Sequence, residues 1–231
     1  MPTDFDSWMA AATMVGQWLS SFGVLVPLAL GIWRWRSLSG PARAVVWYFA
    51  FWTLEAFVDV WSRRVLHTNI YLYHVSVLVE TWLLGWAYYR ALSSPRLRRW
   101  FVPVGLVFTA VAVADATVLS GLDRSNQYAR ALQVVLMLGC ALLYFEQWLH
   151  ELRVREPWQD FMFLVSVGLS VYYAGSVMSY MVADSQTAAN QLMHALALVI
   201  NLSYLFALVL MTLGLWRDGR AGNDLRLKFT K

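Results

Sequence analysis

Several ionisable or strongly polar side chains stand inside long apolar stretches of this chain. Glu80, for example, is preceded by Val77-Leu78-Val79 and followed by Thr81-Trp82-Leu83-Leu84. A charge inside a membrane-length segment costs several kcal/mol unless it is paired or hydrated, so it indicates a ligand site or a buried network. The candidate ligand-binding residues of this kind are Glu55, Asp59, His74, Glu80, Arg130, Tyr173, His194 and Asn201.

Depth along the apolar segments separates these residues into two groups. At about 1.5 Å of rise per residue, Glu80, Tyr173 and Asn201 fall near the midplane, each roughly 15 Å from the outer end. The other ionisable groups fall within roughly 3–6 Å of that end, with Glu55 one turn deeper; they are Asp59, His74, Asp115, Arg130 and His194. The simplest arrangement is a cluster that faces inward and opens to the outer side, as ligand sites in helix bundles often do. The alternative is a network that only fixes helix packing, in which Arg130 pairs with Asp115, Asp59 or Glu55.

Glu80 is the strongest single candidate, because no basic residue is predicted at its depth. Such a carboxyl group is expected to be protonated or to face a water-filled cavity. Its functional roles would be ligand contact or proton sensing. In the structural alternative, it is a neutral acid hydrogen-bonded to Tyr173 or Asn201.

Two histidines raise the question of a metal centre. His74 and His194 are predicted at similar depth, so a zinc or haem site completed by Asp59 or Asp115 stays open as an alternative. No His-x-x-x-His pair places two ligands on one helix face, and no cofactor is predicted. The sequence also lacks Gly-x-Ser-x-Gly, phosphate-loop and Cys-x-x-Cys motifs. A metal-dependent intramembrane lipid hydrolase therefore ranks behind a non-enzymatic function.

The elements that must position these residues are apolar helices. Of the 231 residues, 59% are hydrophobic and 14% are charged, whereas soluble domains carry about 25% charged residues. A membrane helix needs about 20 mostly apolar residues, and seven such stretches follow one another with short connections. The sequence therefore predicts an all-α fold, a single seven-helix transmembrane domain over 1–231, with helices at about 14–33, 44–61, 70–92, 101–119, 128–149, 160–183 and 191–216.

Seven membrane helices are also found in rhodopsins, where retinal is held as a Schiff base on a lysine inside the bundle. Both lysines of this chain, Lys228 and Lys231, lie beyond the last apolar stretch. Retinal is therefore excluded as a cofactor.

Basic residues are divided unequally between the two sides of the predicted bundle. With seven helices, 14 of the 18 Lys and Arg residues fall on one side and 4 on the other. Because basic loops resist translocation, the richer side is cytoplasmic, with the N-terminus outside and the C-terminus inside. Basic loops also suit anionic headgroups of the lipid bilayer, so the net charge of +4 does not indicate nucleic acid. Residues 217–231 form a short basic cytoplasmic tail, too short to fold alone.

Three stretches combine aromatic and polar residues. They are Tyr71-Leu72-Tyr73-His74 leading to Glu80, Asn126-Gln127-Tyr128-Ala129-Arg130-Ala131-Leu132 followed by Leu143-Tyr144-Phe145, and Tyr172-Tyr173-Ala174-Gly175. In these stretches the chain resembles a group of short seven-helix bacterial membrane proteins that are common in Bacteroidota. The resemblance implies a multi-pass protein of the bacterial inner membrane, encoded near two-component signalling genes. It brings no catalytic residue.

The preferred hypothesis is a receptor-like sensor. A small ligand, a lipid or a proton would reach the polar residues of the outer half from outside, and a separate signalling protein would bind the basic cytoplasmic loops or tail. Besides the hydrolase, the alternative is a structural membrane subunit whose polar groups only pack helices. Self-association into a homo-oligomer is left open.

Overall fold

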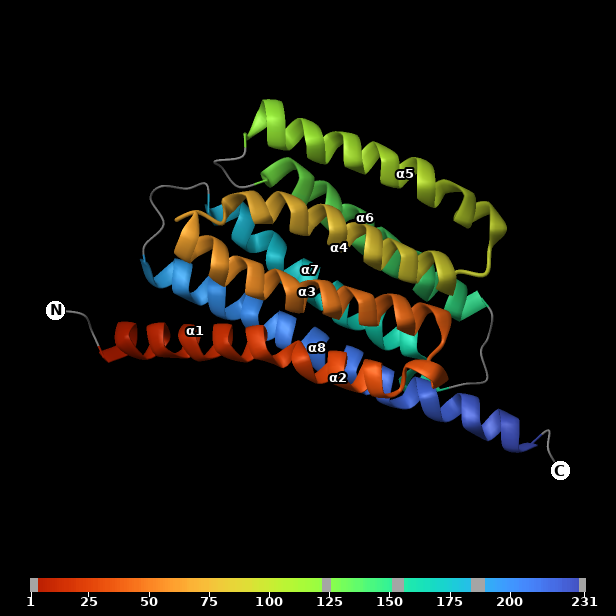
Figure 1. The fold of residues 1–231 in the computed structure, drawn as a ribbon. Coiled ribbons are helices and arrows are strands. Elements are labelled where there is room, and N and C mark those ends of the chain that lie inside the picture. The colour runs from red at the N-terminus through yellow and green to blue at the C-terminus, as the bar shows by residue number, and fades with distance from the viewer. Residues whose placement is uncertain (1–3, 122–125, 151–155, 184–189, 229–231) are drawn as a thin grey trace.

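The computed structural model consists of long helices that run roughly side by side (Figure 1). It describes the chain except for residues 1–3, 122–125, 151–155, 184–189 and 229–231. No β-strand occurs within the described residues. The predicted all-α class is confirmed.

Eight α-helices make up most of the described chain. They are α1 (Asp4–Gly23), α2 (Leu25–Trp33), α3 (Gly40–Val65), α4 (Ile70–Ala91), α5 (Pro95–Ala114), α6 (Gln127–His150), α7 (Phe161–Ala183) and α8 (Asn190–Lys228). A π-helical turn, η2 (Asp115–Leu119), extends α5, and two short 3₁₀ turns, η1 (Trp35–Ser37) and η3 (Pro157–Gln159), precede α3 and α7. Only Val24 separates α1 from α2.

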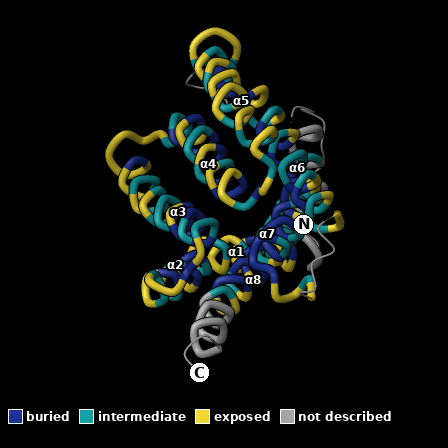
Figure 2. Tube along the Cα trace, turned by 90° about the vertical axis from the view of Figure 1, so that its right-hand side faces the viewer, coloured by how far each residue is buried: buried dark blue, intermediate teal, exposed yellow. Residues whose placement is uncertain are grey.

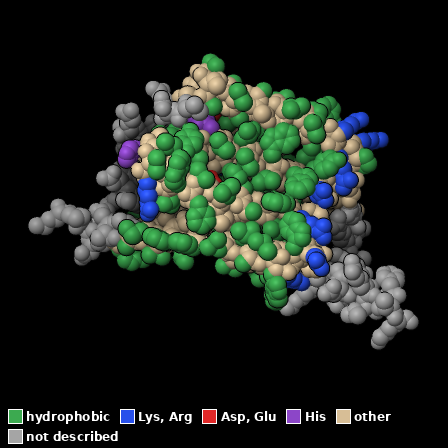
Figure 3. Space-filling view, in the orientation of Figure 1, with side chains coloured by type: hydrophobic (Ala, Val, Ile, Leu, Met, Phe, Trp, Pro, Cys, Tyr) green, Lys and Arg blue, Asp and Glu red, His purple; other side chains and the backbone are tan. Residues whose placement is uncertain are grey.

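Several of these helices have the length and composition of membrane spans. In the described part of the chain, five segments are long and apolar enough to cross a membrane: Ala11–Trp33, Gly40–Val65, Pro95–Leu119, Gln127–His150 and Ala195–Asp218. A shorter apolar stretch, Phe161–Val177, lies within α7. Hydrophobic side chains cover most of the face shown in Figure 3, and Lys and Arg side chains lie toward its ends. Such a surface suits contact with lipid.

Polar side chains define where several helices begin. Ser39 caps α3, since its side chain accepts a hydrogen bond from the amide of Ala42. At the start of α7, Asp160 Oδ1 accepts from the amide of Phe163 at 2.9 Å. These groups satisfy amides that have no partner inside their own helix.

The core lies between α3, α4, α6, α7 and α8, and α5 stands at the edge of the bundle. Fully buried aromatic residues at the centre include Tyr48, Tyr88 and Tyr173. Among the described residues, α5 packs mainly against α4, α6 and its own η2 extension, and Figure 2 shows it at the end of the row formed with α3 and α4. The bundle is therefore densest around α7.

α7 and α8 form the most extensive helix pair, and small residues allow their backbones to approach closely. A Cβ atom added to Gly168 would lie 3.0 Å from the Cα of Ala207, and one added to Gly175 would lie 2.6 Å from Ser203 Oγ. Larger side chains at these two positions would push the helices apart.

Most of the tail predicted at 217–231 belongs to the last helix, and its residues 229–231 lie outside the described chain. α8 continues without interruption from Asn190 to Lys228, where the sequence predicts a span that ends at 216. One reason is that the beginning of the tail is held by other parts of the chain. The Arg217 guanidinium, for instance, donates a hydrogen bond to the carbonyl of Trp158 in η3.

Two further contacts tie the same part of α8 to the connection between α2 and α3. Arg34 donates to the carbonyl of Trp216, and its guanidinium lies 5.4 Å from the centre of that indole ring. Asp218 Oδ2 accepts a hydrogen bond of 2.7 Å from the amide of Ser39. We refer to these contacts, with that of Arg217, as the end clamp.

Candidate functional site: a buried polar network around Glu80

Glu80 lies on the inward face of α4 and is completely buried. The Tyr173 hydroxyl donates to its Oε1 at 3.0 Å. Its Oε2 accepts from Gln133 Nε2 at 3.0 Å and from Arg130 Nη1 at 3.1 Å. Three donors from two other helices, α6 and α7, therefore converge on one carboxyl group.

Arg130 extends this network. Its Nη1 also donates to Gln133 Oε1 at 2.8 Å, and its Nη2 donates to the Tyr172 hydroxyl at 2.9 Å. The arginine side chain is 12% exposed, whereas that of its partner Glu80 is not exposed at all. The pair is therefore a buried ion pair whose remaining hydrogen-bonding groups have polar partners, as such pairs require.

The prediction that no basic residue reaches the depth of Glu80 is wrong. α6 begins about one turn further along the bundle than α4. Asn126, which directly precedes α6, donates a hydrogen bond of 2.7 Å from its Nδ2 to the carbonyl of Tyr73, in the first turn of α4. Arg130, one turn further along α6, then lies about level with Val77, whose carbonyl accepts from Gln133 Nε2. The long arginine side chain covers the remaining distance to Glu80.

The carboxylates that the sequence offers to Arg130 have other partners in the structure. Asp115 is fully buried at the end of α5, where its Oδ1 accepts from Ser120 Oγ and its Oδ2 from the amide of Ala129. It thereby caps the first turn of α6. Asp59 forms an ion pair of 2.7 Å with Arg63, on its own helix.

Aromatic residues of three helices surround the ion pair. The ring of Tyr172 lies 5.1 Å from that of Tyr173 and 5.6 Å from that of Tyr204, on α8. Tyr48, on α3, is buried close enough to interact electrostatically with both Glu80 and Arg130. Neither Tyr48 nor Gln133 is among the sequence candidates.

Gln133 carried one signal in the sequence. It is the only amide side chain in the apolar run of α6 that follows Arg130, and the spacing of three residues places both on one helix face. Tyr48 has no comparable signal, because a tyrosine in an apolar helix is ordinarily a packing residue.

A polar stripe on α3 leads from the end of the bundle near the α3–α4 connection toward this network. Tyr48, Trp52, Glu55 and Asp59 follow one another at spacings of three or four residues, which places them on one helix face. Glu55 is half-buried and accepts a hydrogen bond of 3.3 Å from Ser76 Oγ on α4. The indole nitrogen of Trp52 is buried without a hydrogen-bond partner. Burial along the stripe thus increases from Asp59 to Tyr48.

The other sequence candidates are distributed elsewhere. Asn201 packs against Gly16 of α1, whereas Tyr173, the other predicted partner of Glu80, does donate to it. His74 is buried on α4. His194 lies in α8, but its side chain is outside the part of the chain that the structure describes.

Metal ligands do not gather in the described residues. Among them, no group of three or more His, Cys, Asp or Glu side chains could hold a metal ion. The proposed set of His74, His194 and Asp59 falls partly outside the described side chains, so it stays a prediction.

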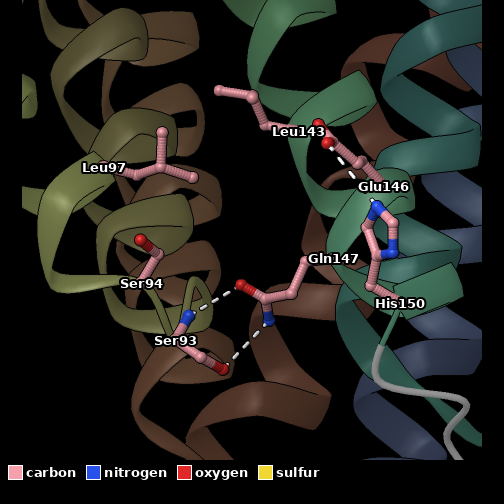
Figure 4. Close-up of a pocket in the computed structure, with 7 residues that line it drawn as sticks. All are labelled: Ser93, Ser94, Leu97, Leu143, Glu146, Gln147 and His150. Carbon is pink, nitrogen blue, oxygen red and sulfur yellow. Dashed lines mark hydrogen bonds and ion pairs between the residues drawn. The ribbon is translucent and has the colours of Figure 1, made fainter.

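A second polar feature is a groove between the start of α5 and the end of α6 (Figure 4). Its volume is about 470 Å³, and its lining includes Leu97, Leu143, Glu146 and His150. It lies at the end of the bundle away from Asp59, because α6 runs from the level of Tyr73, near the start of α4, to His150.

Comparison of the chain with protein-family models, with curated proteins and with solved structures gives no match in any of the three. The resemblance to short seven-helix bacterial membrane proteins therefore stays a prediction.

Proposed function

We propose that the protein is a seven-helix protein of the bacterial inner membrane, with the N-terminus outside. The five membrane-length segments support this proposal. α4 and α7 complete the seven, since α4 has 22 residues and α7 has 23, each sufficient to cross the apolar layer. The charged group in the middle of α4, Glu80, is fully buried and paired inside the bundle, as expected for a membrane helix.

Within this architecture, we propose that the protein is a receptor-like sensor. The observation that carries the proposal is the buried ion pair between Glu80 and Arg130, which joins α4 and α6 and reaches α7 through Tyr172 and Tyr173. Apolar side chains of similar volume would pack these helices at lower desolvation cost, whereas removing one partner of a buried pair is strongly destabilising. Such a pair is well suited to a switch, because a ligand or proton that competes for either partner changes the contacts of three helices at once.

The ligand reaches the pair from the outer side, along the stripe of α3. Asp59 is 20% exposed at the outer end of this stripe, Glu55 is half-buried, and Tyr48 is almost completely buried at its inner end. A small molecule, a lipid headgroup or a proton could act here, because the stripe offers carboxylates, an indole donor at Trp52 and phenol groups. The signal then passes to a partner protein that binds the basic cytoplasmic loops.

Ligand-induced thermal stabilisation tests the proposal. Purified wild type, Glu80→Gln and Asp160→Asn would be compared over a panel of lipids and metabolites and over pH. Asp160 is the matched control, since it is also a buried carboxylate and accepts from Tyr144 at 2.7 Å, but it lies at the other end of the bundle. A ligand at about 100 times its Kd adds about 2.7 kcal/mol, or roughly 5–10 °C in Tm for a chain of this size.

We expect that shift in wild type and Asp160→Asn, and its loss in Glu80→Gln. Tyr173→Phe, which removes one donor to Glu80 and keeps the ring, should reduce the shift while the protein stays folded. A panel that shifts none of the proteins, or that shifts Glu80→Gln as much as wild type, contradicts the proposal.

A further inference from the structure

The groove between α5 and α6 has an apolar part and a polar part. Leu97 and Leu143 lie on opposite walls, Ser94 and His150 lie toward the end of the helices, and the carboxylate of Glu146 is drawn beside Leu143 (Figure 4). Gln147 closes one side, since its amide exchanges two hydrogen bonds with Ser93, of 2.7 and 3.1 Å. The groove is thus amphipathic along its length.

α5 has its fully buried contacts in the half away from the groove, whereas its first half packs through Phe101, which is only partly buried and lies against Tyr89 of α4. Phe108 and Ala112 of α5 are buried against Val77 and Ala129, whereas Trp100, near the start of α5, is 59% exposed. The leucine side chains at positions 97 and 143 do not fill the space between the two helices. In a membrane, a gap of this kind between helices is filled by lipid, because water is excluded from the hydrocarbon layer.

The polar part of the groove offers charges of both signs. The N-terminus of α5 supplies partial positive charge. Ser94 is the N-cap residue of α5 but makes no side-chain capping hydrogen bond, and Pro95 has no amide hydrogen. The first free amides of α5 therefore favour an anionic group. Arg96 and Arg99 are exposed on the same turn and add positive charge.

On the opposite wall, Glu146 supplies a carboxylate that is 64% exposed, with His150 Nε2 3.8 Å away. A carboxylate on one wall and a helix N-terminus on the other match a headgroup that carries both an ammonium group and a phosphate. The carboxylate disfavours a headgroup whose only charge is negative, since Glu146 would then lie beside a like charge.

We infer that this groove binds a phospholipid with a primary ammonium headgroup, phosphatidylethanolamine, taken from the surrounding bilayer. One acyl chain lies between Leu97 and Leu143, the phosphate lies at the start of α5, and the ammonium group donates to Glu146. A choline headgroup lacks the N–H donors for this last contact. The inference rests on the proposed membrane location and is independent of the role of Glu80.

Native mass spectrometry of the intact protein released from nanodiscs tests this inference. The nanodiscs would contain equal amounts of phosphatidylethanolamine, phosphatidylglycerol and phosphatidylcholine. Wild type should retain one phosphatidylethanolamine in preference to the other two. Glu146→Gln should reduce that preference about threefold, the effect expected for one partly exposed charge pair. Glu156→Gln, which alters an exposed carboxylate outside the groove, should leave the preference unchanged.

Leu97→Trp tests the acyl-chain part, because the larger side chain would fill the groove and should abolish retention of the lipid. Equal retention of the three lipids by wild type overturns the inference, as does a preference that survives Glu146→Gln or a lipid that survives Leu97→Trp. None of these outcomes bears on ligand binding at Glu80, which is measured separately by thermal shift.

Discussion

Neutralising one member of the Glu80–Arg130 pair should destabilise the protein far more than neutralising both. In Glu80→Gln, the guanidinium of Arg130 remains in a site where its side chain is 12% exposed, without the carboxylate that accepts its hydrogen bond. Removal of one partner from a buried pair typically costs about 3–5 kcal/mol. In membrane proteins, hydrogen bonds between helices are worth less, about 0.6 kcal/mol on average, because the unfolded chain in the membrane also finds partners.

The burial of this pair decides between the two magnitudes. The Glu80 side chain has no exposure and accepts hydrogen bonds from three donors. When one partner of the pair is removed, the charge of the other therefore stays buried without an equivalent partner. We therefore expect a loss of about 3 kcal/mol for Glu80→Gln and for Arg130→Met. For the double variant, we expect about 1–2 kcal/mol, which gives a coupling energy above about 3 kcal/mol.

Unfolding in mixed micelles titrated with a denaturing detergent measures these four free energies. The control cycle uses Asp59→Asn and Arg63→Gln, an ion pair on α3 whose arginine is 63% exposed. That cycle should give a coupling energy below about 1 kcal/mol. If the Glu80–Arg130 cycle is additive within about 0.5 kcal/mol, the two groups do not form the buried charge pair on which the proposed switch depends.

Three other predictions concern the membrane arrangement, the helix packing and the metal alternative. In a protein whose native cysteine, Cys140, is replaced by alanine, an impermeant maleimide should label Arg64→Cys in intact spheroplasts. It should label Ser37→Cys only after lysis, and the reverse pattern would invert the proposed orientation. Gly168→Leu should lower stability by about 2–3 kcal/mol in the same detergent titration, because the new side chain meets the backbone of Ala207; an unchanged midpoint would mean that α7 and α8 do not pack this closely. Elemental analysis of the purified protein should find no stoichiometric zinc, iron or manganese, and a stoichiometric metal would revive the lipid-hydrolase alternative.

The positions of the helices follow from local sequence, and so they could be predicted. Pro41, Pro95 and Pro157 each stand within the first two residues of a helical element, where a missing amide hydrogen has no cost. Apolar runs of about 20 residues then fix the helix lengths. The continuation of α8 past residue 216 could not be predicted in this way, because the contacts of Trp216 with Arg34 and of Asp218 with Ser39 depend on residues far away in the sequence.

The candidate site was predicted only in part, because its central contact depends on how far one helix is displaced along another. Depths counted from each outer end assume that all helices begin in one plane, and α6 violates this assumption by about one turn relative to α4. Glu80 and Tyr173 were identified because each interrupts an apolar run near its middle. The hydrogen bonds from Arg130 and Gln133 to Glu80 can be predicted only when the displacement of α6 along α4 is known. That displacement depends on tertiary contacts such as the cap that Asp115 provides for α6.

The proposed switch at Glu80 requires a link to the end of the bundle at the end clamp, and α7 and α8 are the elements that connect the two. Tyr172 and Tyr173 place α7 in the network, and the close backbone packing at Gly168 couples α7 to α8. α8 in turn enters the end clamp. Because a densely packed pair of helices moves as a unit, loss of the Glu80 contacts should loosen the clamp as well. Amide hydrogen exchange should therefore increase in Glu80→Gln both near residue 80 and around Trp216, but remain at the wild-type level around Trp216 in Asp59→Asn. An increase confined to α4 and α6 would show that the network does not communicate with the end clamp.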